Sequence, residues 1–163
     1  MDVDSKHLQM LIQRAHLHKG TSFIEILQNC VIFNDGAFDN YTLKQHREDR
    51  VVYLEHDKPM VFGKQKDKAI KLDGFTPVLI DLNDGKHSIN DALIYNEKSK
   101  ELAYIISQFS DNPAMPLPVG VFLDINYTTF EDDMTAQIAE AKKKLGEGDI
   151  NTLLKGKSYW EIN

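Results

Sequence analysis

The chain has 163 residues, of which 42% are apolar and 27% are charged. This composition is typical of a globular domain with a real core and excludes a disordered chain. With 25 acidic and 19 basic residues, the net charge is −6, which argues against nucleic acid as a bulk partner. No stretch approaches the roughly 18 apolar residues that span a bilayer. A single cysteine cannot form an internal disulfide, and no export signal is visible, so we expect a cytoplasmic protein without a membrane partner.

The N-terminal third predicts a helix followed by a strand and a loop. The helix has apolar residues spaced three and four apart, can be capped by Asp4 or Ser5, and ends before Gly20. Residues 21–27 are rich in β-branched and aromatic side chains, which predicts a strand. This strand leads to Cys30, the only cysteine, and residues 34–40 read as a loop.

The middle of the chain predicts short strands and one clear helix. Residues 41–50 favour a short helix, and residues 51–55 and 60–63 read as a β-hairpin around the four-residue turn 56–59. The lysine-rich run KQKDKAIK, residues 64–71, favours a mobile solvated loop. Residues 78–82 predict a strand that ends in the turn 83–85. Ser88 can cap a segment that begins at residues 89–91, although residues 93–95 could equally be a strand. A helix is predicted from Lys98 or Ser99 to Phe109.

The C-terminal part begins with a proline-rich run. Residues 113–120 contain three prolines within six positions, which predicts an extended chain, and residues 119–125 are an apolar segment. Thr128 or Thr129 can cap a helix over 130–145, with acidic residues in its first turn and lysines in its last. One more helical turn is expected over 150–154, and Tyr159 and Trp160 are candidates to anchor the terminus.

Several long runs resemble one enzyme family. HKGTSFIEILQNCVIFNDGAFDNYT (residues 18–42) resembles the end of the thiamine-diphosphate domain in the β subunits of 2-oxoacid:ferredoxin oxidoreductases, most closely the 2-oxoglutarate type. HREDRVVYLEHDKPMVFG (46–63) and KAIKLDGFTP (68–77) continue the resemblance. DALIYNEKSKELAYIISQF (91–109) and MPLPVGVF (115–122) extend it more weakly. The resemblance therefore covers nearly three quarters of the chain.

The resemblance implies an activity and a set of cofactors for a parent enzyme. Such an enzyme decarboxylates a 2-oxoacid, reduces ferredoxin through a 4Fe-4S cluster, and forms acyl-CoA with thiamine diphosphate and Mg²⁺. Family members begin with a CxxC pair, a third cysteine and a GDG…N motif, whereas this chain has one cysteine and only Asn83-Asp84-Gly85. We therefore expect the C-terminal part of such a subunit, without cofactors or turnover of its own.

The resemblance also implies a domain division and partners. The expected fold is α/β (or α+β), with residues 1–40 as the last helix and strand of the thiamine-diphosphate domain. Residues 41–163 would form the β-subunit extension, a mixed β-hairpin and helical region. The expected partners are the α subunit, the missing N-terminal part of the β subunit and ferredoxin, and the piece can self-associate. The alternative is a stand-alone, non-catalytic domain that binds a partner subunit.

Cys30 is the main candidate site residue. By resemblance it supplies the fourth thiolate of the 4Fe-4S cluster, because such clusters are normally held by four cysteines. The alternatives are a small buried residue or a nucleophile paired with His18 or His56. On this interpretation Cys30 alone holds no cluster.

The other polar candidates favour ordinary roles. Glu25, Asp35 and Asp39 can serve as a base or bind magnesium, but loop solvation is the favoured interpretation. His7, His16 and His18 lack the helical spacing of a shared metal site, and are interpreted as solvated or capping residues. For the lysine-rich run, the alternative to a solvated loop is an electrostatic contact with an acidic electron carrier or with coenzyme A phosphates.

Overall fold

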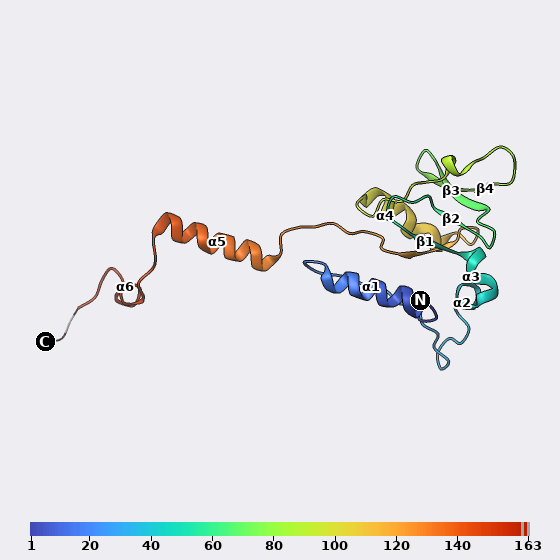
Figure 1. Ribbon diagram of the computed structural model, residues 1–163. Helices are drawn as coiled ribbons and strands as arrows, with labels where there is room; N and C mark the ends of the chain where they lie inside the picture. Colours follow the sequence, from blue (N-terminus) through green and yellow to red (C-terminus); the bar gives the residue numbers. More distant parts are fainter. Residues whose placement is uncertain (161, 163) are drawn as a thin grey trace. The chain divides into compact units, whose positions relative to one another are not determined.

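The computed structural model describes residues 1–160 and 162, and these form two compact units, residues 1–125 and 126–163. Within the described residues, the first unit combines helices with small parallel and antiparallel sheets, which confirms the predicted α/β class (Figure 1). The described part of the second unit contains the helices α5 and α6. The proposed functional division at residue 40 concerns the parent subunit and stays a prediction.

The first unit opens with helix α1 (Ser5–Leu17), as predicted. Asp4 caps it, because the carboxylate Oδ1 of Asp4 accepts a hydrogen bond from the backbone N–H of His7 at 3.2 Å. After α1, residues 18–38 contain no strand. Short helices α2 (Asp39–Thr42) and α3 (Lys44–Arg50) then lead into the sheet region, close to the helix expected over 41–50.

The strand predicted over residues 21–27 is wrong. Its backbone makes no ladder with any described strand, and the alternating side chains are exposed on both sides, including Phe23 at 91% and Ile26 at 43%. Strand-forming side chains lower the free energy only when a neighbouring backbone and a packing surface are present. Within the described residues only Leu27, at the end of this segment, has a backbone partner and a packing surface.

The predicted hairpin over residues 51–63 is also wrong. Strand β1 (Val51–Leu54) pairs in parallel with β5 (Leu117–Gly120), and β2 (Val61–Phe62) pairs antiparallel with β3 (Lys68–Asp73). The expected turn, residues 56–59, bonds to a distant segment, since the Asp57 N–H donates to the Tyr95 carbonyl at 2.8 Å. The cause is burial: β1 is buried along its length and needs cover that a two-stranded hairpin does not supply.

The lysine-rich run is half strand. Its second half begins β3, which pairs along its whole length with β4 (Thr76–Asp81). Ala69 and Ile70 are fully buried in β3, whereas Lys64 and Lys66 are exposed. The expected solvated loop is therefore confined to the first half, because two apolar residues between the lysines supply the core-facing positions.

Helix α4 and the 3₁₀ turns η1 and η2 lie beside the sheets, and α4 completes the core. Ser88 caps the 3₁₀ turn η1 (Ile89–Asp91), and Ser99 caps α4 (Lys100–Ser107), which continues as η2 (Gln108–Asp111). Helix α4 directs Leu102 and Ile106 inward. The main core contains these buried residues: Val52, Leu54, Met60, Phe62, Ile70, Tyr95, Leu102, Ile106, Phe109 and Met115.

Gly120 lets the two parallel strands approach. At its φ of +141° a Cβ would lie 2.8 Å from the Cβ of Leu54, so only glycine fits beside β1. The proline-rich run before it is extended only in its second half, which forms β5. Residues 113–115 turn instead, and the Met115 N–H donates to the Asn112 carbonyl at 2.9 Å. Pro118, which has no backbone N–H, lies opposite Val52 in β5.

The second unit matches its prediction closely. Thr129 caps helix α5 (Phe130–Leu145) through a capping box with Asp132, and Gly146 ends it. Asp149 caps the short helix α6 (Ile150–Lys155). Tyr159 and Trp160 are 58% and 80% exposed, so the expected anchoring role is not seen within the described residues.

Candidate functional site

Cys30 lies in a short loop that is held by its neighbour, Asn29. The Asn34 N–H donates to the Cys30 carbonyl at 3.0 Å. The Asn29 side chain donates to the carboxylate of Asp35 at 2.9 Å and accepts from the N–H of Gly36 at 2.9 Å. These bonds join both arms of the loop, so that the cysteine sits at a defined turn and not on a free chain.

The thiol of Cys30 is exposed and is surrounded by backbone donors. The nearby backbone N–H groups of Phe33, Ile32 and Asn34 favour the thiolate, and this lowers the pKa of the thiol. A thiolate stabilised in this way is a better metal ligand and a better nucleophile than an ordinary thiol. The buried alternative for Cys30 is therefore wrong, because the side chain faces solvent.

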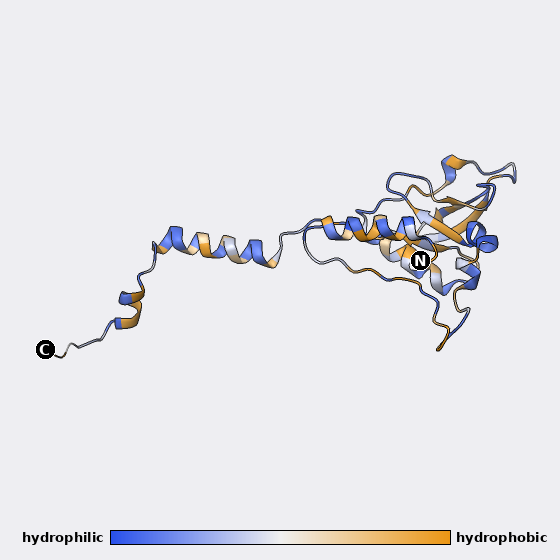
Figure 2. Cartoon of the chain, turned by 60° about the horizontal axis from the view of Figure 1, so that its bottom comes forward, coloured by the Kyte–Doolittle hydropathy of each residue, from blue (hydrophilic) through white to orange (hydrophobic). Residues whose placement is uncertain are grey.

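Exposed apolar side chains flank Cys30 on both sides. We call residues 21–33 the apolar segment. Its most exposed large side chains are Phe23, Val31, Ile32 and Phe33, between 73% and 91%. Figure 2 shows the apolar colouring of the chain that follows α1. Scattered exposed apolar residues are ordinary, but a run of this kind marks an interaction surface.

The base of the apolar segment is fixed to the core. The Asp2 N–H donates to the Leu27 carbonyl at 3.1 Å, and Leu27 packs against the cluster of Met1, Val51 and Val119. The Ser22 hydroxyl donates to the Ala15 carbonyl at 3.1 Å. The exposed side chains are thus presented from a backbone that is attached at two points.

An ionic cluster attaches α1 to the same core. The Arg14 guanidinium donates two hydrogen bonds to the carboxylate of Glu97, at 2.9 and 3.1 Å, and a third to Asp124 at 2.9 Å. His18 Nδ1 lies 3.3 Å from Asp124, and the Lys98 ammonium also lies 3.3 Å from it. Because Glu97 is buried, its charge needs the Arg14 fork. Sequence reasoning missed this cluster, since its members are up to 110 residues apart.

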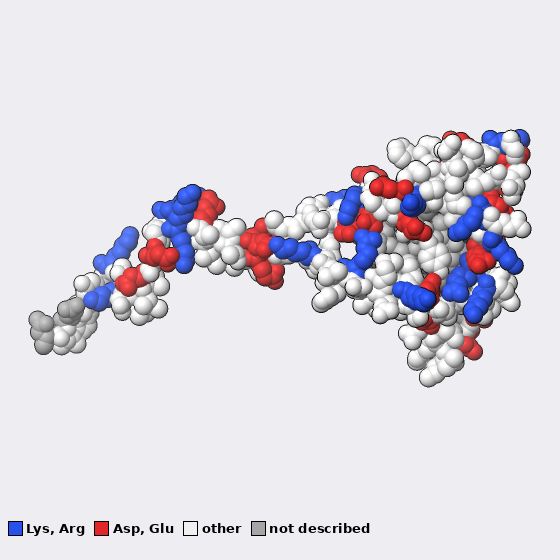
Figure 3. Space-filling view, in the orientation of Figure 1, with Lys and Arg blue, Asp and Glu red and all other residues white. Residues whose placement is uncertain are grey.

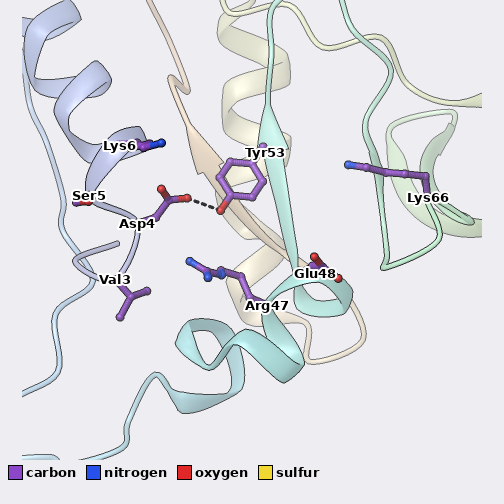
Figure 4. A pocket seen from close by; sticks show the side chains of 8 residues that line it. All are labelled: Val3, Asp4, Ser5, Lys6, Arg47, Glu48, Tyr53 and Lys66. Carbon is purple, nitrogen blue, oxygen red and sulfur yellow. Dashed lines mark hydrogen bonds between the residues drawn. The ribbon is translucent and has the colours of Figure 1, made fainter.

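The start of α1 forms one side of a pocket of about 540 Å³ (Figure 4). The Tyr53 hydroxyl donates to the Asp4 carboxylate at 2.7 Å, and this bond lowers the pKa of Asp4. Burial, together with the Asp4 carboxylate, raises the pKa of Tyr53 to about 12. Lys6, Arg47 and Lys66 also line the pocket, so it combines both charge signs. Sequence reasoning gave Asp4 only its capping role.

The remaining candidates are not brought together. The Asp84 carboxylate accepts from the N–H groups of Lys86 and His87 and contacts His87 Nδ1 at 2.7 Å, so local turn bonds occupy it. Asp35 is bonded within the Cys30 loop. Among residues 1–160 and 162, no three His, Cys, Asp or Glu side chains form a group that could hold a metal ion.

Three of the histidines, His7, His18 and His56, lie in three different environments. His7 packs edge-on against the Tyr53 ring, with centroids 5.0 Å apart, and His18 faces Asp124. His56 Nδ1 accepts from the Glu97 N–H at 3.3 Å, so this histidine and His18 both bind partners other than Cys30. In the part of the chain that the structure describes, no helix is long and apolar enough to cross a membrane.

Comparison with known proteins gives one clear similarity. The chain is 29% identical over 167 aligned positions to the 2-oxoglutarate oxidoreductase subunit KorB of Mycobacterium tuberculosis. The alignment covers the whole of this chain and 44% of that relative, so the chain spans less than half of the relative's length. No family model matches the chain. No solved structure matches it either. The resemblance that the sequence indicated is thus confirmed as a similarity to a 2-oxoglutarate oxidoreductase subunit along the entire chain.

Proposed function

We propose that this chain is part of the β subunit of a 2-oxoglutarate:ferredoxin oxidoreductase. The observation that carries the proposal is the similarity to KorB, because it extends over every part of the chain. Such an enzyme oxidatively decarboxylates 2-oxoglutarate, forms acyl-CoA and reduces ferredoxin. The lone cysteine, which needs no disulfide partner, is consistent with work in the reducing cytoplasm.

Cys30 is the proposed ligand of a 4Fe-4S cluster in that enzyme. Its exposed thiol and lowered pKa support the proposal, as do the three backbone donors, because hydrogen bonds to the sulfurs tune such clusters. When bound, the cluster supplies one-electron transfer. The other three thiolates come from outside this chain, since it has a single cysteine.

Thiamine diphosphate and Mg²⁺ are proposed for the parent enzyme only. Among the described residues, no acidic or histidine group is arranged as a metal site, and Asp84 is engaged in its own turn. We therefore assign no residue of this chain to these cofactors and expect no turnover from the chain alone.

The apolar segment is the proposed contact with the rest of the subunit. A strand-forming sequence that pairs with no strand among the described residues is what a piece of a larger sheet presents. Residues 1–40 would then complete the cofactor domain, and residues 41–163 would form the extension that meets the α subunit. The exposed Phe23 and Phe33 support this division.

Reconstitution tests the proposal. The chain would be co-expressed with the part of KorB that it does not match and with the α subunit of that enzyme. We expect copurification, cluster absorbance and 2-oxoglutarate- and CoA-dependent reduction of a viologen dye. Cys30→Ala should remove the cluster signal, whereas the matched small change Ser110→Ala, at an exposed position of η2, should keep it. Turnover by the chain alone, or a cluster that survives Cys30→Ala, would contradict the proposal.

The alternative is a stand-alone domain that binds a partner subunit without catalysis. The core of residues 1–125 favours it, since a compact unit with its own buried core is what a domain that folds alone requires. The two candidates differ in what the purified chain does. A stand-alone domain should be monodisperse and should not bind a hydrophobic dye, whereas a piece of a larger subunit should bind the dye or self-associate.

A further inference from the structure

Helix α5 carries an apolar stripe that no described residue of its own unit covers. The stripe consists of residues spaced four and three apart: Phe130, Met134, Ile138, Ala141 and Leu145. At 100° per residue these five side chains fall within an arc of roughly 80°. Phe130 and Leu145 are 74% and 87% exposed, and α5 has no buried residue. Such a narrow seam is the pattern of a helix that packs against a second helix.

The charges of α5 are separated toward its two ends. Glu131, Asp132 and Asp133 lie in the first turn, and Lys142, Lys143 and Lys144 lie in the last. Figure 3 shows the red group at one end of this helix and the blue group toward the other. This order complements the helix dipole, and it also makes the helix electrostatically complementary to an antiparallel copy of itself.

The apolar and charged positions agree on one register. When the helix is reversed about its centre, between residues 137 and 138, Phe130 lies opposite Leu145 and Met134 lies opposite Ala141. Ile138 then lies next to the two-fold axis and packs against the same residue of the second copy. Each apolar layer therefore combines a large side chain with an apolar partner, without a polar residue in the seam.

The same register matches the charges beside the seam. Glu131 and Lys142 border one edge of the stripe, and Asp133 and Lys144 border the other. Across a two-fold antiparallel pair each edge meets the same edge of the second copy. Glu131 then faces Lys142 of the second copy, and Asp133 faces Lys144. A parallel pair would set acid against acid and lysine against lysine, which disfavours it.

We propose that α5 is a homodimerisation helix that pairs antiparallel with α5 of a second copy of this chain. The inference is independent of the proposed enzymatic function, because it uses only residues 130–145. The helix is about 24 Å long, so the pair alone falls below the roughly 1,200 Å² of standard stable interfaces. It therefore acts as a weak, reversible contact between two copies.

Cysteine cross-linking of the full chain tests the contact. In a Cys30→Ser background, Ile138→Cys places a thiol beside the two-fold axis, and the control Ala136→Cys places it on the opposite face of α5. We expect a disulfide-linked dimer on oxidation with diamide from Ile138→Cys, and several-fold less from Ala136→Cys. Equal cross-linking of both variants, or none from Ile138→Cys, would overturn the proposal.

A mixture of two variants tests the orientation. Phe130→Cys in a tagged chain and Leu145→Cys in an untagged chain should give mostly mixed dimers, because these positions face each other only in the antiparallel register. Predominantly like-with-like dimers would establish a parallel pair and overturn the proposal.

Sedimentation separates this contact from the apolar segment. Ile138→Asp puts two carboxylates beside the axis and should weaken self-association at least about tenfold. Phe23→Asp should leave the α5-dependent association in place. Self-association that is unaffected by Ile138→Asp, or a chain that sediments as a monomer at every concentration, would show that α5 is covered by something other than a second copy.

Discussion

Two apolar, strand-forming stretches of this chain have opposite fates. Strand β1, VVYL, is buried and pairs with β5, which lies more than 60 residues further along the chain. The apolar segment, with FIEIL at its centre, is exposed and pairs with no described strand. Local propensity is similar in both, so the difference lies in the partner. The first stretch finds its partner inside the chain, and the second presents an unused surface.

The largest expected effect on stability tests this comparison with two phenylalanines, one in the core and one in the apolar segment. Phe109 is 2% exposed in the main core, whereas Phe23 is 91% exposed in the apolar segment. Phe109→Ala should lower the free energy of unfolding by about 3–5 kcal/mol. Phe23→Ala should change it by less than about 0.5 kcal/mol. Urea unfolding of both variants measures the difference, and a comparable loss from Phe23→Ala would mean that the apolar segment is buried in solution.

A smaller effect is expected where α1 is held to the core. Arg14→Gln removes the guanidinium fork and leaves the Glu97 carboxylate buried with weaker partners, which should cost about 1–2 kcal/mol. The matched control is Lys98→Gln, which removes one positive charge from the same cluster. Its ammonium is exposed and lies 3.3 Å from Asp124, so the loss should stay below about 0.5 kcal/mol.

Hydrogen exchange locates the Arg14 effect. The amides of α1 should exchange faster in Arg14→Gln while those of β1 keep their protection, because the ion pairs join α1 to an otherwise intact core. If Arg14→Gln and Lys98→Gln behave alike in unfolding and exchange, the fork does not hold α1.

The sequence predicted local structure better than pairing. Helices α1, α4 and α5 follow from apolar spacing, and α1 and α5 also follow from their caps, Asp4 and Thr129. These signals lie within a few residues of one another, so a single sequence carries them. The pairing of β1 with β5 depends on a proline-rich run that reads as extended but does not indicate its neighbour. Adjacent strands favoured a hairpin, and burial of β1 overrode that preference.

The candidate site could likewise be predicted where its signal is local and not where it depends on distant residues. Cys30 was identifiable because it is the only cysteine and because the surrounding run resembles a known subunit. Its exposure and its backbone donors were not predictable, since they depend on the turn that Asn29 closes. The Arg14–Glu97 fork joins residues 83 positions apart, and nothing in either local sequence distinguishes these charges from solvated ones.

The pH dependence of stability tests the strand that is buried in this comparison, β1. Its residue Tyr53 has a pKa that is raised to about 12 by burial and by the Asp4 carboxylate. In the unfolded chain its hydroxyl ionises near the ordinary tyrosine pKa of about 10, so between about pH 10 and 12 the folded state binds more protons. This contribution is present below pH 10 and is lost as the pH rises through that window.

Tyr53→Phe should therefore flatten the fall of unfolding free energy between pH 10 and 12. The control Tyr104→Phe changes a side chain that is 69% exposed, and the slope should match that of the unaltered chain. Urea titrations at intervals across the window measure both slopes. A slope unchanged by Tyr53→Phe would show that its hydroxyl is not held in the Asp4 bond.

The smallest effect on stability, and the sharpest on chemistry, is expected at Cys30. Cys30→Ser should change the unfolding free energy by less than about 0.5 kcal/mol, because the side chain is exposed. The folded chain should nevertheless react with iodoacetamide faster than a urea-unfolded chain at neutral pH, since the backbone donors lower the pKa of the thiol only when the loop is formed.

Asn29→Ala should slow the reaction toward the unfolded rate, because it removes the side chain that joins the arms of the loop. The control Gln28→Ala changes a neighbouring amide and should leave the rate unchanged. Equal rates in the folded and unfolded chains would mean that the loop does not prepare the thiolate. A fast rate that disappears when the chain is assembled with the rest of a β subunit is the result expected of a cluster ligand.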